Sequence, residues 1–138
     1  MSAAQVFENS SGPTVASLMS QPVLTIEVGE SLWDAWQLLF VSGLRHLVVL
    51  DQDGSSLGVL SDRNILAEVP ATAEHLSIRQ VGDVLAMVPF VSVRPSDHPL
   101  VAAKAMASHS IEAVPVLDEA GRLLGIVTES DIVRWLVR

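Results

Sequence analysis

The chain contains two copies of one unit, and this internal repeat constrains its fold more than any other feature. The run Leu44–Asp51 corresponds to Ile111–Asp118, 67 positions later. The same spacing joins Gly54 to Gly121 and holds without a gap from Pro22 to the end of the chain. So long a match indicates tandem copies of one supersecondary unit that bury a shared core. The 138 residues therefore have room for two half-size units.

Each copy has the order strand, helix, strand, strand, helix, which predicts an α/β (α+β) fold. Ser31, with Asp34 three residues later, is typical of a helix start, and Gly43 is typical of a helix end. The predicted strands are Val23–Ile26, Leu47–Leu50, Leu57–Leu60, Phe90–Val93, Val114–Leu117 and Leu124–Val127. Helices are predicted at Val15–Met19, from Ser31 to Gly43, from Ser61, at Ser77–Leu85, Leu100–Ser108 and Asp131–Val137.

Composition excludes several classes of function. A formal charge of −8 opposes nucleic-acid binding. Although 49% of the residues are hydrophobic, no apolar run approaches the roughly 20 residues of a membrane span, so we expect no membrane partner. The absence of cysteine excludes disulfides and thiolate metal sites, and four scattered histidines predict no metal site. No catalytic motif occurs, and the N-terminus lacks the features of a signal peptide. We therefore expect a cytoplasmic protein that is not an enzyme.

The most specific pattern of the chain lies in its second copy. It consists of IEAVPVLD at residues 111–118, Gly121, and LGIVTESD at residues 124–131. This pattern closely resembles the signature of the cystathionine-β-synthase-type (CBS) domain family, and the repeat resembles a tandem CBS pair, or Bateman module, from about Val15 to Arg138. The first copy resembles the signature less closely.

The resemblance implies a fold and a mode of action. Two βαββα repeats would pack through their sheets about a pseudo-twofold axis, with clefts that in many members bind AMP, ATP or S-adenosylmethionine. Family members usually regulate and often form face-to-face homodimers. The expected divisions are a disordered segment 1–13, a first repeat 14–66, a linker with the start of a connecting helix 67–80, and a second repeat 81–138. With no effector domain in this sequence, we expect a stand-alone module that acts on a separate regulated protein or through its assembly.

Asp131 is the strongest candidate for a ligand-binding residue. A carboxylate at a helix start accepts hydrogen bonds from both hydroxyls of a ribose, and Thr128 matches a family position whose hydroxyl meets the ribose or phosphate. The same Thr-x-x-Asp spacing is that of a capping box, and the two roles can coexist. By resemblance, the base meets the first strand and the segment before the second strand, although the apolar residues there are equally consistent with ordinary core. The predicted primary nucleotide cleft comprises Ser92, Val93, Ile111, Glu112, Ala113, Val114, Pro115, Thr128 and Asp131.

The first copy holds Asn64 where the second holds Asp131. Loss of the charge reduces a hydrogen bond of about 1.5–3 kcal/mol to one nearer 0.5–1.5 kcal/mol, which predicts a weaker, differently selective or empty second cleft. Its residues are Thr25, Ile26, Leu44, Arg45, His46, Leu47, Ser61, Arg63 and Asn64.

Cations for a phosphate are few. Arg63 and Arg45 are the candidates, and a solvated surface charge is the alternative for each. The second copy has Ser130 and Glu112 at their positions. This mismatch predicts a ligand with few or no phosphates beside Asp131, unless Arg63 or Lys104 reaches that cleft.

Two functions remain open. The module senses an adenosine-containing ligand, such as AMP, ADP, ATP, NAD or S-adenosylmethionine, none of them a required cofactor, or it is a ligand-independent dimerisation or scaffold module. The helix with Trp33, Trp36 and Phe40 is apolar almost all round, and we expect one side of it, and also Trp135, to meet a second subunit of a homodimer.

Overall fold

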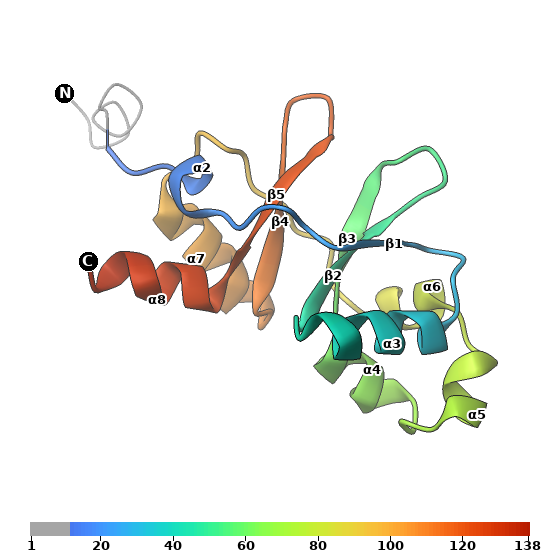
Figure 1. Cartoon of the computed structure of the whole chain (residues 1–138). Helices are drawn as coiled ribbons and strands as arrows, with labels where there is room; N and C mark the ends of the chain where they lie inside the picture. Colours follow the sequence, from blue (N-terminus) through green and yellow to red (C-terminus); the bar gives the residue numbers. More distant parts are fainter. Residues whose placement is uncertain (1–11) are drawn as a thin grey trace.

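The computed structural model describes residues 12–138, and most of the segment 1–13 expected to be disordered lies outside them. The first half contains α2 (Val15–Leu18), β1 (Thr25–Glu27), α3 (Leu32–Ser42), β2 (His46–Leu50), β3 (Ser56–Ser61) and α4 (Asp62–Glu68) (Figure 1). The second half contains α5 (Ala73–Ser77), α6 (Val81–Leu85), α7 (Pro99–His109), β4 (Ala113–Leu117), β5 (Leu123–Thr128) and α8 (Glu129–Leu136). The predicted α/β fold of two related repeats is confirmed, and the first strand of the second repeat is reduced to a bridge at Val93.

Local signals explain where the two long helices begin and end. The Ser31 side chain accepts a hydrogen bond from the Asp34 amide at 3.0 Å and so caps α3. Gly43 ends α3 in the left-handed region, at φ 72°. Helix α7 begins with Pro99, which needs no amide partner at that position, and ends at Ser110.

The two sheets repeat one register. In the first, β1 runs parallel to β2, and β2 pairs antiparallel with β3. In the second, β4 and β5 pair antiparallel, with an irregularity at Val116 and Leu117 that matches the one at Val49 and Leu50.

The predicted strand Phe90–Val93 is wrong, because only Val93 forms a bridge, to Val116. The carbonyls of Pro95 and Asp97, which follow it, accept hydrogen bonds from the backbone of α2, and the chain turns there instead of extending the sheet. This competing contact comes from the far end of the sequence.

The predicted single helix Ser77–Leu85 is also wrong, since it divides into α5 and α6. Between them, the Arg79 carbonyl accepts from the Leu32 amide at 2.8 Å, and the Val81 amide donates to Glu30 at 2.9 Å. In a continuous helix the Arg79 carbonyl and the Val81 amide would pair within the helix. Here they pair instead with the backbone at the start of α3.

The short helices α2 and α6 each pack into the core of the other repeat. Val15 and Leu18 of α2 belong to the second core with Val114 and Val127, whereas α6 contributes Val81, Val84 and Leu85 to the first core. The chain after α2 crosses the edge of β5, where the Ser20 amide donates to Ile126 at 2.8 Å. A side chain at Gly125 would meet the Met19 sulfur at 2.7 Å, so the glycine permits this approach. The two repeats are interlocked by these exchanges (Figure 1).

A third apolar cluster joins the two sheets. It consists of Val48 and Val59 from the first sheet and Ala113 and Ile126 from the second, all buried. The helices α3 to α6 lie at one end of the molecule and α7 and α8 at the other, with the sheets between them (Figure 1). No helix within residues 12–138 is long and apolar enough to cross a membrane.

Candidate functional site: two cavities between the repeats

Two cavities lie where the repeats meet, and equivalent positions of the repeats line them. The Asn64 cavity has a volume of about 180 Å³ and is lined by His46, Val59, Ser61, Arg63, Asn64, Val88, Pro89, Val91, Ser110, Ile111, Glu112, Ala113 and Pro115. The Thr128 cavity has a volume of about 340 Å³ and is lined by Ser20, Gln21, Pro22, Val23, Leu24, Leu44, Arg45, His46, Ile126, Thr128, Ser130 and Arg134. Positions 67 apart, such as Leu44 and Ile111 or Ser61 and Thr128, face opposite cavities.

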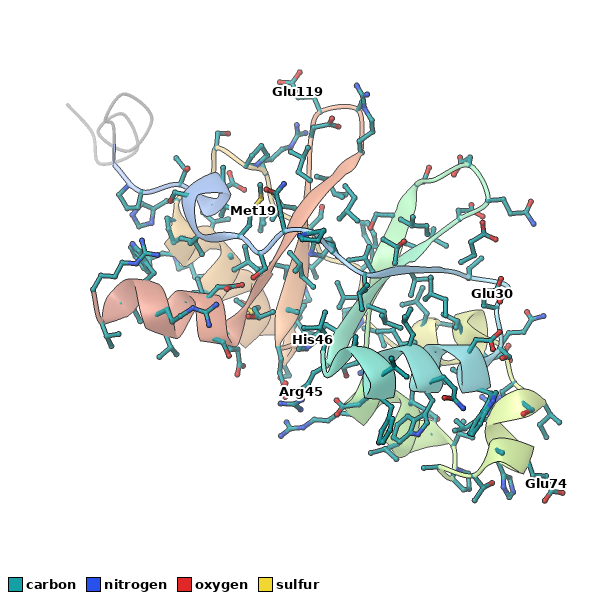
Figure 2. The ribbon with its side chains drawn as sticks, in the orientation of Figure 1. Met19, Glu30, Arg45, His46, Glu74 and Glu119 are labelled. Carbon is teal, nitrogen blue, oxygen red and sulfur yellow. The ribbon has the colours of Figure 1, made fainter. Side chains whose placement is uncertain are left out.

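A central cavity of about 250 Å³ lies between them. It is lined by Gly43, Leu44, Arg45, His46, Glu112, Thr128, Glu129 and Ser130. Figure 2 shows the labelled Arg45 and His46 at this boundary between the repeats.

The structure corrects the grouping of residues predicted from the sequence. Each cavity combines the helix start of one repeat with the segment before the second strand of the other. Ile111, Glu112, Ala113 and Pro115 therefore lie with Asn64, not with Thr128. Leu44, Arg45 and His46 lie with Thr128, and His46 lines both cavities. The physical reason is the packing of sheet against sheet, which brings each helix start opposite the partner repeat.

Several predicted residues lie outside both cavities. Ile26, Leu47, Val93 and Val114 are buried in the two repeat cores. Thr25 and Ser92 are exposed and line neither cavity.

Asp131 lies behind Thr128 and is only 3% exposed. Its Oδ2 accepts from the Thr128 amide at 2.9 Å, and its Oδ1 accepts from the Ser20 hydroxyl at 3.1 Å and from Arg134. The Asp131 amide in turn donates to Thr128 Oγ1 at 3.3 Å, so the predicted capping box is present. Asp131 is thus a structural carboxylate, and the most exposed of these partners is the Arg134 side chain, at 66%.

Asn64 has the same place at the start of α4 with fewer partners. Its side-chain Oδ1 accepts hydrogen bonds from the Ser61 backbone amide and from the Ser61 hydroxyl, both at 2.8 Å. The Asn64 backbone amide donates to the Ser61 hydroxyl at 3.1 Å. The capping box is conserved in geometry between the two repeats, while the carboxylate and its arginine belong to one of them.

Charged side chains join the two cavities. The Glu112 carboxylate pairs with Arg63, which lines the Asn64 cavity, and lies 3.7 Å from the guanidinium of Arg45, which lines the Thr128 cavity. Arg45 also lies 3.6 Å from Asp62. Arg45 and Arg63, the two phosphate contacts predicted from the sequence, therefore both lie beside Glu112. Glu112 is the equivalent of Arg45 in the second repeat.

His46 lies at the centre of this arrangement. Burial lowers its pKa, the Glu112 and Asp62 carboxylates oppose that shift, and Arg45 reinforces it. Its Nε2 is buried without a hydrogen-bond partner among residues 12–138. Burial therefore favours the neutral form of the imidazole.

Sequence reasoning missed the segment Ser20–Leu24 and Arg134 as lining residues of the Thr128 cavity. The sequence contained a signal for the segment Ser20–Leu24 and another for Arg134. Pro22 matches Pro89 in the repeat register, and Arg134 follows Asp131 by three residues, within reach on one helix face. Within residues 12–138 no cluster of three or more histidine, aspartate or glutamate side chains is arranged to hold a metal ion.

Two interlocked βαββα repeats with twin inter-repeat cavities define a tandem-repeat module. A model of the CBS domain matches residues 15–71 and again residues 81–138. The chain therefore belongs to the CBS domain family, and the resemblance inferred from the sequence is confirmed.

Individual relatives differ in the share of their length that this chain covers. The chain is 37% identical over 124 residues to the homoserine O-acetyltransferase of Methanococcoides burtonii, across 89% of this chain and 24% of that protein. It thus spans about a quarter of that relative's length. It is 29% identical over 133 residues to a CBS domain-containing protein of Dictyostelium discoideum, across 90% of this chain and 91% of that one. Among solved structures, CBSX2 in complex with AMP matches with a TM-score of 0.74 and 28% identity, across 91% of this chain and 97% of that chain.

Proposed function

We propose that this protein is a regulatory module that binds an adenosine-containing ligand in the Thr128 cavity and transmits its occupancy to a partner protein. The observation that carries the proposal is the lining of that cavity. Apolar side chains, the Thr128 hydroxyl and the guanidinium groups of Arg45 and Arg134 surround about 340 Å³. Small-molecule sites have roughly 300 to 1,000 Å³ and combine apolar walls with a few polar groups.

The contacts of Asp131 suggest how a nucleotide would be held. A ribose diol that donates to the carboxylate would replace Arg134 there. The released guanidinium, which already lines the cavity, would then be available to a phosphate. Arg45 contributes a second positive charge from the other repeat. The cavity thus offers the phosphate clamp that the sequence of the second repeat alone lacks.

The match to CBSX2 supports the ligand class, because that protein was solved in complex with AMP. A ligand in the Thr128 cavity would contact both repeats, since Leu44 comes from the first and Ser130 from the second. Binding would therefore favour one relative arrangement of the repeats, which a partner can recognise.

Matched blocking variants test this proposal. Leu44 and Ile111 occupy equivalent positions in opposite cavities, so a tryptophan at either one fills one cavity and leaves the other open. We expect calorimetry to detect binding of at least one of AMP, ADP, ATP, NAD and S-adenosylmethionine to the wild type and to Ile111→Trp. Leu44→Trp should weaken that binding by about tenfold or more, which corresponds to about 1.4 kcal/mol. Absence of binding to the wild type, or equal binding by both variants, would refute the proposal.

A surface of α3 and α4 favours assembly as a second role. Phe40 and Val41 of α3 are 82% and 79% exposed, and Leu66 of α4 is 52% exposed. A recess of about 130 Å³ between Trp36 and Phe40 lies on the same face. A large exposed apolar patch is typical of a protein contact, and we propose a second copy of this chain as its occupant.

Light scattering after size exclusion tests the assembly. We expect a dimer for the wild type and a monomer for Phe40→Glu. The control is Ile78→Glu, a substitution at a residue that is 78% exposed and lies between α5 and α6. A monomeric wild type at micromolar concentration would exclude the dimer. A dimer that binds no adenosine ligand would favour the scaffold role over sensing.

A further inference from the structure

The Glu112 carboxylate occupies the place between the cavities where two arginines converge. Arg45 and Glu112 are equivalent positions of the two repeats, so they meet across the pseudo-twofold axis. Arg63 approaches the same carboxylate from the start of α4 and pairs with its Oε1. The Glu112 side chain is 26% exposed, whereas those of Arg45 and Arg63 are 50% and 69% exposed. The carboxylate is thus the least exposed member of the cluster, and both guanidinium groups are more accessible to a ligand.

A carboxylate and a phosphate bind a guanidinium in the same way, through parallel hydrogen bonds to two oxygens. Glu112 lines the Asn64 cavity together with Arg63 and the central cavity together with Arg45. A phosphate that approached either arginine would therefore have to displace Glu112 from the guanidinium. The negative charge of Glu112 would also repel the phosphate.

We propose that Glu112 competes with ligand phosphate for Arg45 and Arg63 and thereby sets how strongly the module prefers phosphorylated over unphosphorylated adenosine ligands. The inference rests on the proposed function and assigns Glu112 as a specificity-determining residue. In the Asn64 cavity the Arg63 charge is already neutralised, which favours ligands without a phosphate. In the Thr128 cavity Arg134 lies beyond the reach of this competition, because its partner is Asp131.

The test is the ratio of AMP to adenosine affinity, measured by calorimetry. Glu112→Gln keeps the side-chain shape and removes the charge. We expect AMP to bind about three- to tenfold more tightly, while adenosine affinity stays within about twofold, as an exposed charge contact of this kind predicts. Glu119→Gln is the control, because it removes the same charge at the exposed turn between β4 and β5, far from Arg45 (Figure 2).

A second variant guards against failure to fold. Glu112→Asp keeps the charge on a side chain one methylene shorter, which weakens its contacts with the two arginines, and we expect a smaller gain in AMP affinity. Circular dichroism verifies that each variant is folded. Equal tightening of AMP and adenosine, or no change for AMP in either folded variant, would overturn the competition while leaving the proposed function intact. If neither compound binds the wild type, the competition is overturned, whereas the proposed function fails only if ADP, ATP, NAD and S-adenosylmethionine also do not bind.

Discussion

The two helix starts, Ser61 to Asn64 and Thr128 to Asp131, share one backbone geometry and differ in charge at two positions. The first has Arg63 and Asn64 where the second has Ser130 and Asp131. The hydrogen bonds described above for Asn64 are all with Ser61, and they cap α4. Asp131 also accepts hydrogen bonds from Ser20 and Arg134, so it joins the N-terminal segment to the second repeat. The equivalents of Ser20 and Arg134 in the first repeat are Met87 and Ala67, whose side chains donate no hydrogen bond. The wider contacts of Asp131 therefore depend on its partners as well as on its charge.

The largest predicted difference concerns stability. Asp131→Ala would leave the Thr128 amide, the Ser20 hydroxyl and Arg134 without their acceptor, and we expect a loss of about 2 to 4 kcal/mol. Asn64→Ala removes only a cap and should lose about 1 kcal/mol. Urea unfolding of both variants measures the difference. Equal losses would mean that the added contacts of Asp131 contribute nothing.

Converting one helix start into the other is the second prediction. Asn64→Asp retains the oxygen that accepts from Ser61 and adds a carboxylate for a ribose. In a Leu44→Trp background, where only the Asn64 cavity is open, adenosine should bind about fivefold more tightly than to Leu44→Trp alone. The matched change Asp131→Asn in an Ile111→Trp background should weaken adenosine binding by a similar factor. An unchanged affinity after Asn64→Asp would show that the cavity walls, not the helix start, limit binding.

Salt should weaken AMP binding to the Thr128 cavity by a smaller factor. In Ile111→Trp, where the Thr128 cavity remains open, AMP affinity should fall about two- to fourfold between low salt and about 0.5 M salt, because Arg45 and Arg134 are exposed to screening. Adenosine, titrated in parallel as the uncharged control, should be insensitive. A salt-independent AMP affinity would contradict phosphate binding by these arginines.

The smallest expected effect involves His46, whose equivalent in the second repeat is Ala113. Burial lowers the His46 pKa below its ordinary value of 6.5, so as pH falls through 6.5 the unfolded chain takes up a proton that the folded protein resists. The stability that neutral His46 contributes above pH 6.5 is therefore lost as the pH falls. Urea unfolding from about pH 7.5 to about pH 5.5 should show a smaller decrease for His46→Ala than for the wild type. Parallel curves would show that His46 takes no part.

Much of the secondary structure could be predicted because its causes are local. Ser31, Gly43 and Pro99 act on neighbouring backbone groups, and the structure places the helix boundaries at them. The failures lie where a distant segment competes for the backbone. α2 takes the carbonyls after Val93, and the loop before α3 interrupts the predicted helix Ser77–Leu85.

The candidate site likewise has a part that is recognisable from local sequence and a part that only the fold brings together. Thr128 and Asp131 are recognisable because a helix cap and a ribose hook need the same spacing. The segment that faces them could not be assigned, since sequence proximity suggests Ile111 to Pro115, whereas the structure brings Leu44 to His46. Arg45 thereby serves the cavity whose own repeat has Glu112 at that position.

The sequence by itself determined that this protein consists of two CBS repeats in one register, because periodic apolar residues, turns and caps act over a few positions and recur 67 residues apart. Only the tertiary structure decided how the copies exchange α2 and α6, which helix start faces which strand, and that Glu112 holds both arginines. Those outcomes depend on burying two sheets against each other, and the face that each repeat presents to its partner has no local signal in the chain.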